Sequence, residues 1–308
     1  MKLKTPRAVI KAHDISQLRF RDTPFVKLMN KRIYNVLMVA SRYDMFILED
    51  DGRVDEQIFN EYTSLNLRYP PRFTQVGNNR DALAELKQNH YELIICMPNM
   101  DSSDTFDLAK QIKVHYSDIP VVLLTPFSKA VTQSLSREDL SGIDYVFSWL
   151  GDTDLLLAII KVVEDRMNVE HDVKTVGVQT IMLVEDSVRF YSSALPLLYK
   201  FVLSESREFS KEALNDHLRM LRMRGRPKIL LARNYEEAVS YYRKYGDNML
   251  GVISDMSFNV KGEKDKQAGK RLGEWIREKD TYIPIIYTSS ESENRKYIHQ
   301  ENAVFIDK

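Results

Sequence analysis

Charged and hydroxyl side chains in the second half of the sequence follow short apolar runs, at the points where strands are expected to end. They are Glu185 and Asp186 after the run 181–184, Asp255 after 251–254, Ser289 after 283–286 and Lys308 after 303–306. Clustered carboxylates raise one another's pKa unless a cation balances them. Mg²⁺ is the natural cation, since it prefers carboxylate and water oxygens.

An aspartate beside such a cation can act as a nucleophile on phosphorus and form an aspartyl-phosphate. A metal and a lysine then offset the charge on the transferring oxygens. We therefore expect Asp255 to accept a phosphoryl group, with Mg²⁺ held by Glu185, Asp186 and Asp255. The hydroxyl of Ser289, favoured over the adjacent Thr288, and the ammonium of Lys308 would bind the phosphoryl group.

The elements that must position these residues alternate along the chain. The first half has apolar strand-like runs at 36–39, 72–76, 93–96, 119–124 and 145–147, and helical periodicity at 79–90, 106–114 and 155–167. Continuous apolar runs are typical of strands buried on both faces. Strands alternating with helices predict a parallel sheet covered on both sides. We predict an α/β, flavodoxin-like doubly wound fold with five strands in the order 2-1-3-4-5, whose binding crevice lies at the carboxyl ends of the strands.

The same pattern recurs in the second half, at 181–184, 228–232, 251–254, 283–286 and 303–306. Such internal repetition predicts two similar units. We divide the chain into an extension at 1–32, a first domain at 33–168, a polar linker at 169–179 and a second domain at 180–308.

The second unit departs from the pattern in two places. The stretch 187–226 is too long for one ordinary helix, and its apolar stripe predicts one or two long helices that make most of the contact between the halves or between subunits. The sequence also stops at Lys308, without a last helix. This predicts either a fragment of a longer protein or a sheet left partly uncovered.

The acids, the hydroxyl and the lysine of the second half, in this order along the sequence, resemble those of the receiver domains of two-component response regulators. The resemblance implies the acidic pair in Glu185 and Asp186, the phosphoacceptor in Asp255 and the conserved lysine in Lys308. It further implies that the main-chain carbonyl of Ser257 is a metal ligand, and that Phe305 is the switch aromatic. A histidine kinase or a small-molecule phosphodonor would be the partner.

The corresponding positions of the first half have lost this chemistry. Ala40 and Ser41 stand at the acidic pair, Met97 (or Cys96, one residue earlier) at the acceptor, Thr125 at the hydroxyl and Ser148 at the lysine. Without carboxylates there is neither a magnesium site nor an acceptor. We expect a degenerate receiver that keeps its fold for packing or for protein contact.

The whole arrangement also resembles the tandem receiver region in front of phosphoenolpyruvate-synthase-like or pyruvate-phosphate-dikinase-like catalytic domains. That resemblance implies a catalytic domain beyond Lys308 in a longer protein. The leading hypothesis is a phosphorylation switch. The alternative is a phosphorylation-independent scaffold or homodimer from the regulatory region of such a protein. An independent phosphatase is disfavoured, because its second acid belongs two residues after the nucleophile, where Ser257 stands.

Composition limits the remaining classes. The chain carries 44 Lys and Arg against 44 Asp and Glu, so bulk charge favours neither nucleic acid nor an anionic membrane as a partner. No apolar run reaches the roughly 18 residues of a membrane span. A single cysteine, Cys96, excludes a disulfide framework and suits a reducing cytoplasmic location.

Overall fold

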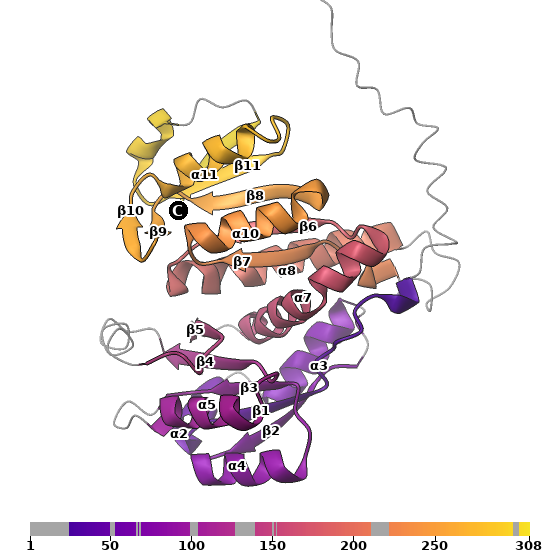
Figure 1. The fold of residues 1–308 in the computed structure, drawn as a ribbon. Coiled ribbons are helices and arrows are strands. Elements are labelled where there is room, and N and C mark those ends of the chain that lie inside the picture. The colour runs from indigo at the N-terminus through magenta and orange to yellow at the C-terminus, as the bar shows by residue number, and fades with distance from the viewer. Residues whose placement is uncertain are drawn as a thin grey trace, which may run out of the picture.

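The computed structural model describes residues 25–49, 53–65, 67, 69–98, 104–126, 139–149, 151, 153–210, 222–297 and 302–308. Within these ranges the chain forms two five-stranded parallel sheets, one in each half (Figure 1). The structure thereby confirms the predicted α/β doubly wound fold.

The first sheet has the strand order β2-β1-β3-β4-β5. Its strands are β1 (Asn35–Val39), β2 (Arg72–Val76), β3 (Leu93–Cys96), β4 (Val121–Pro126) and β5 (Tyr145–Trp149). Its helices are α2 (Arg42–Leu48), α3 (Val54–Ser64), α4 (Asn79–Gln88), α5 (Asp104–His115) and α7 (Asp154–Val176). Every residue of β3 is buried, as expected for a central strand covered on both faces.

The second sheet repeats this order as β7-β6-β8-β11-β12. Its strands are β6 (Thr180–Val184), β7 (Lys228–Ala232), β8 (Met249–Asp255), β11 (Ile285–Ser289) and β12 (Ala303–Asp307). The helices are α8 (Val188–Ser210), α10 (Tyr235–Tyr245) and α11 (Ala268–Arg277), with 3₁₀ turns η2 (Gly246–Asn248) and η3 (Ser292–Tyr297). On β12, Val304 and Ile306 are exposed, so one side of this edge strand is uncovered.

A short hairpin after β8 was not predicted. It consists of β9 (Phe258–Val260) and β10 (Glu263–Asp265), which pair antiparallel. Lys261 and Gly262 form its two-residue turn with φ of 52° and 86°, and positive φ at both central residues matches the twist of a hairpin. Three-residue strands with polar side chains carry too little periodicity to be recognised in the sequence.

Helix α7 lies between the two sheets (Figure 1) and is the element that both halves share. The predicted linker at 169–179 is wrong for most of its length, because α7 continues to Val176 and ends at the left-handed Gly177. Val169 and Asp172 in this stretch are buried. Asp172, one of the polar residues that suggested a solvated connection, instead lies inside the protein, whereas Glu170 and Lys174 pair with each other at the surface.

Buried ion pairs connect α7 to the second sheet. The Asp165 carboxylate accepts two hydrogen bonds from Arg226, at 2.7 and 2.9 Å, and one from the Tyr199 hydroxyl at 2.9 Å. Asp172 pairs with Lys228 at 3.0 Å and also accepts the main-chain N–H of Met29 at 3.2 Å. The described end of the predicted extension, which includes the 3₁₀ turn η1 (Phe25–Lys27), is therefore packed against the body of the protein.

Helix α8 forms much of the remaining contact between the halves, as expected for the described part of 187–226. Tyr191, Leu195 and Tyr199 are buried on its inner face. Tyr191 donates its hydroxyl to the Val146 carbonyl and meets the Phe147 ring edge-on at 5.5 Å. Residues 211–221 of the predicted insert lie outside the described ranges.

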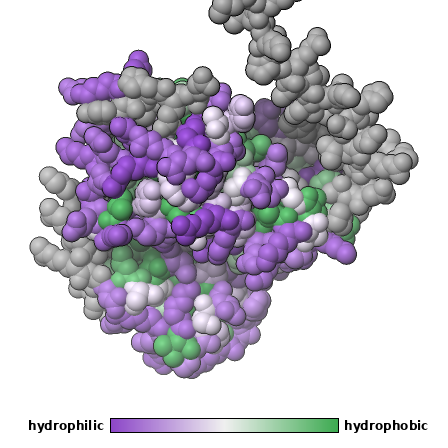
Figure 2. Space-filling model, turned by 45° about the horizontal axis from the view of Figure 1, so that its top comes forward, coloured by the Kyte–Doolittle hydropathy of each residue, from purple (hydrophilic) through white to green (hydrophobic). Residues whose placement is uncertain are grey.

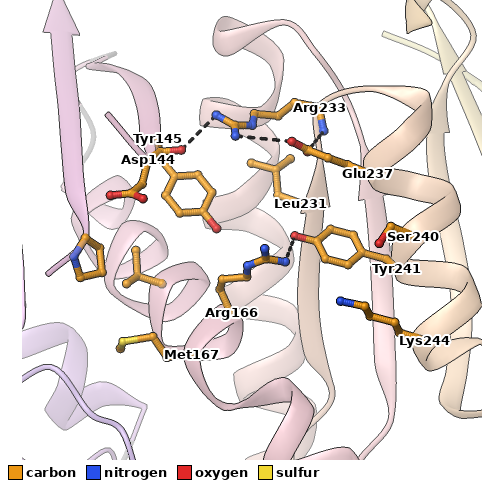
Figure 3. A pocket seen from close by; sticks show the side chains of 12 residues that line it. Asp144, Tyr145, Arg166, Met167, Leu231, Arg233, Glu237, Ser240, Tyr241 and Lys244 are labelled. Atoms are coloured by element: carbon orange, nitrogen blue, oxygen red, sulfur yellow. Dashed lines mark hydrogen bonds and ion pairs between the residues drawn. The ribbon is translucent and has the colours of Figure 1, made fainter. Parts of the chain in front are cut away.

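A cleft of about 250 Å³ remains between the halves, above α7 (Figure 3). Arg233 crosses it and donates to the main-chain carbonyl of Asp144 at 3.0 Å. Arg166 hydrogen-bonds the Tyr241 hydroxyl and stacks over its ring at 5.1 Å. Both arginines thus already bind groups of the protein, and the cleft is part of the contact between the halves.

The surface in Figure 2 is mostly hydrophilic, with small separate apolar patches. Among the described helices, none is long and apolar enough to cross a membrane.

Candidate functional site

The carboxyl ends of β6 and β8 bring three acidic side chains together. The two strands are neighbours, with Val184 paired to Ser254, so Glu185 and Asp186 leave β6 beside Asp255. Their carboxylate oxygens lie within 4.8 Å of one another. Glu185 and Asp255 are 3% and 8% exposed. The three acids therefore converge at one edge of the sheet, as the spacing in the sequence predicts.

Lys308 completes the cluster from the other side. Its main-chain N–H donates to the Ser289 carbonyl at 2.9 Å, which fixes its position at the end of β12. Its ammonium lies 2.9 Å from the Asp255 carboxylate and also pairs with Glu185. The same ammonium nitrogen lies 4.2 Å from the centre of the Phe190 ring.

Glu185 lies in a buried environment with charges of both signs nearby. Burial raises its pKa, and the nearby charge of Asp255 raises it further, whereas the contact with Lys308 opposes both. Glu185 also accepts the main-chain N–H of Ser187 at 3.0 Å. An additional positive charge close to this carboxylate would favour its charged form.

A second lysine, Lys264, was missed in the sequence. Its ammonium contacts both carboxylate oxygens of Asp186, at 2.7 and 2.8 Å. It is carried by β10 of the unpredicted hairpin, so no strand-end rule could have identified it.

The hydroxyl of Ser289 lies in a hydrogen-bonded pocket at the end of β11. It accepts the main-chain N–H of Glu291 at 3.0 Å and the side-chain amide of Asn294 at 2.9 Å. Asn294 was also missed, because it comes from η3, a turn with no sequence periodicity. The roles assigned to the Ser257 carbonyl and to the half-buried Phe305 stay predictions.

Gly269 allows α11 to approach Asp255 closely. Its N–H donates to the Met256 carbonyl at 3.0 Å. A Cβ here would lie 2.9 Å from Met256 Cα and 3.1 Å from Asp255 C, and closer still to the Asp255 carbonyl oxygen. A glycine is needed because the obstacle is main chain, which cannot turn aside.

The pairing registers locate the corresponding edge of the first half. Val39 pairs with Cys96 as Val184 pairs with Ser254, which puts Ala40 and Ser41 at the acidic pair and Met97, not Cys96, at the acceptor. Thr125 corresponds to Ser289.

The register of the fifth strand decides which residue of the first half corresponds to Lys308. Thr125 pairs with Ser148, whereas Ser289 pairs with Asp307. Ser148 therefore corresponds to Asp307, and Trp149 rather than Ser148 stands at the lysine position. The sequence prediction was one residue early because the length of the loop before a fifth strand does not fix its register.

The polar groups at this first edge serve local structure. Ser41 caps α2 by accepting the Asp44 N–H at 3.1 Å, and Thr125 donates to the Phe147 carbonyl at 3.3 Å. Over the described ranges, the grouping of potential metal ligands falls on the second half.

The donor set of the second half fits Mg²⁺. It offers three carboxylates at one edge, all oxygen, and no cysteine or histidine among the three. Hard oxygen donors with room for water and phosphate oxygens are what this ion prefers.

No protein-family model and no curated protein matches the sequence. Several solved structures resemble it at low similarity. The receiver domain of the Francisella response regulator 1452 is 18% identical, with 44% of this chain and 99% of that chain covered and a TM-score of 0.31. The signal receiver domain of an HD domain-containing protein from Pseudomonas fluorescens Pf-5 is 21% identical, with 46% and 97% covered and a TM-score of 0.28.

A probable two-component system response regulator/GGDEF domain protein is 12% identical across 89% of this chain and 91% of that chain, with a TM-score of 0.34. Two of these three neighbours are receiver domains, and the third is a probable two-component response regulator. At such values they carry no argument about function, which must come from the site itself.

Proposed function

We propose that the second half is a receiver module that accepts a phosphoryl group on Asp255 in a Mg²⁺-dependent reaction. The observation that carries this proposal is the convergence of Glu185, Asp186 and Asp255 at one sheet edge, with the Lys308 ammonium 2.9 Å from Asp255.

In the proposed reaction a carboxylate oxygen of Asp255 attacks the phosphorus of the donor. A new oxygen–phosphorus bond forms, the bond from phosphorus to the leaving group breaks, and that bond's electron pair departs with the leaving group. Lys308 lies beside the attacking carboxylate and stabilises the negative charge of the transferring oxygens. The Ser289 hydroxyl would donate a hydrogen bond to the bound phosphoryl group.

Glu185, Asp186 and Asp255, with the main-chain carbonyl of Ser257, would hold the metal. When bound there, Mg²⁺ would supply positive charge that offsets the negative charge of the phosphoryl group. The chain's own part is to keep the acids partly desolvated, which strengthens each of these electrostatic interactions.

The consequence of acceptance would be a change of charge at the end of β8, next to the ends of β11 and β12. The added phosphoryl charge would draw the Ser289 loop inward and let Phe305 change position between two states. A histidine kinase or a small phosphodonor would supply the group. The first half, which has Ala40, Ser41 and Met97 at the positions that correspond to the three acids, would be the silent partner that packs through α7. A phosphoenolpyruvate-synthase-like catalytic domain would be the output in a longer protein.

The test is incubation of the purified chain with acetyl phosphate, with and without Mg²⁺, followed by intact-mass spectrometry. We expect one phosphoryl addition that requires Mg²⁺ and is lost in Asp255→Asn. Asp44→Asn, which removes an acid beside the corresponding edge of the first half, is the matched control and should keep the addition. No addition in the unmodified chain would refute the proposal and favour the phosphorylation-independent scaffold.

A further inference from the structure

The hairpin β9–β10 places the ammonium group of Lys264 against Asp186, one of the three acids. Lys264 contacts both oxygens of Asp186, at 2.7 and 2.8 Å. Asp186 is 10% exposed in this pair, whereas Lys264 is 54% exposed. The lysine thus reaches from solvent to a carboxylate that is mostly covered.

The formal charges at the edge show what this contact does. Glu185, Asp186 and Asp255 bring three negative charges, and the paired ammonium groups of Lys308 and Lys264 bring two positive charges. The two lysines pair with different acids: Lys308 pairs with Asp255 and Glu185, whereas Lys264 pairs with Asp186. Lys264 therefore occupies the same carboxylate that a metal ion would use.

The main chain of the hairpin makes contacts along its whole length, whereas the Lys264 side chain is 54% exposed. Phe258 at its start is fully buried, and Asn259 bridges to Asn234 beside β7. At the turn, the main-chain N–H of Lys261 donates to Glu236 at 3.1 Å. At the far end, Asp265 forms an ion pair with Arg271 of α11.

We propose that Lys264 competes with the divalent cation for Asp186, so that cation binding requires its ammonium to swing away into solvent. The inference rests on the proposed function, because it concerns the same acidic site. It assigns Lys264 a positioning role: the side chain holds Asp186 in place and lowers the affinity of the site for a cation until the ion displaces it.

The test is isothermal titration of the full chain with MgCl₂ at low ionic strength. Lys264→Met keeps the length of the side chain and removes its charge. We expect it to tighten Mg²⁺ binding about two- to fivefold, the range that corresponds to the measured worth of exposed ion pairs. Lys266→Met removes the same charge from a nearby exposed position and should leave the affinity unchanged. Added salt should reduce the difference in Mg²⁺ affinity between Lys264→Met and the unmodified chain, because the charge of the exposed Lys264 ammonium is screened.

A second readout follows the lysine itself. Acylation of Lys264 by an amine-specific reagent, measured by peptide mass spectrometry, should speed up when Mg²⁺ is added, while acylation of Lys266 should not. This readout needs no phosphoryl transfer.

The outcomes separate the inference from the proposed function. If Mg²⁺ binds equally tightly to the unmodified chain and to Lys264→Met, the competition is refuted and the proposed acceptor site stands. If neither protein binds Mg²⁺, the metal site and the competition both fail. Unfolding curves of both variants confirm that each protein is folded before titration.

Discussion

Replacing Gly269 by alanine should have two opposite effects on stability, because it favours the helix but crowds the main chain at Asp255, the proposed acceptor. Gly269 lies in the first turn of α11, where alanine should by itself stabilise a helix by about 1 kcal/mol. The new Cβ would, however, lie 2.9 Å from Met256 Cα and 3.1 Å from Asp255 C. Carbon atoms prefer separations of about 3.5–4.0 Å, so α11 and the acceptor segment must separate by roughly 0.6 Å or more.

Overpacking of this kind costs about 1–3 kcal/mol. The crowded atoms here belong to the main chain, which cannot move aside easily. The cost of overpacking should therefore lie near the upper end of that range and exceed the gain in helix propensity. We expect Gly269→Ala to lower the free energy of unfolding by about 1–2 kcal/mol, the difference between those two terms. Urea denaturation measures this value.

The same displacement should slow phosphoryl acceptance, since a shift near 1 Å in a reacting group can cost about 10²-fold in rate. Gly77→Ala is the control, because a Cβ there meets nothing within 4 Å, and it should leave both stability and acceptance nearly unchanged. An alanine at 269 that stabilises the protein and leaves the rate intact would refute the reasoning.

Three further predictions concern buried charges and the phosphoryl pocket. Asp165→Asn leaves the Arg226 guanidinium, which is 3% exposed, without its carboxylate. It should lower the free energy of unfolding in urea by about 3–5 kcal/mol. A smaller loss than that of Tyr199→Phe, about 1 kcal/mol, would contradict this prediction. Burial and the charge of Arg226 lower the pKa of Lys228 to about 8 from its ordinary value of 10.5. Between those two values the unfolded chain binds the extra proton, so the free energy of unfolding, measured relative to that of Lys228→Met at each pH, should rise between pH 8 and 10 on the order of 2 kcal/mol. Ser289→Ala removes the acceptor of two hydrogen bonds and should cost about 1–3 kcal/mol, while acetyl phosphate labelling is slowed but, unlike in Asp255→Asn, not abolished.

The fold and the acidic cluster could be predicted for a common physical reason. A central parallel strand is buried on both faces, so it appears in the sequence as an unbroken apolar run, such as 93–96 or 181–184. The doubly wound order then makes the first and third strands neighbours, and their carboxyl ends meet at one edge. Glu185, Asp186 and Asp255 could therefore be brought together from the order of the residues alone, as could Lys308 at the end of the fifth strand.

The features that the sequence could not reveal depend on contacts between distant segments. The polar stretch after 168 was predicted as a linker because its charges suggested solvent, yet Asp172 is fully buried against Lys228. Pairing across the sheet, not loop length, decides that Trp149 rather than Ser148 matches Lys308.

Lys308 and Lys264 show which contacts can be predicted from chain order and which only the folded structure reveals. The position of Lys308 follows from local rules, because a strand end fixes which edge of the sheet its side chain reaches. Lys264 lies on a three-residue strand with no periodic signal, and only the folded hairpin brings its ammonium to Asp186. Chain order alone therefore predicted that the three acids and Lys308 meet, whereas only the tertiary structure showed that Lys264 lies against Asp186, because this ion pair depends on a distance that chain order does not encode.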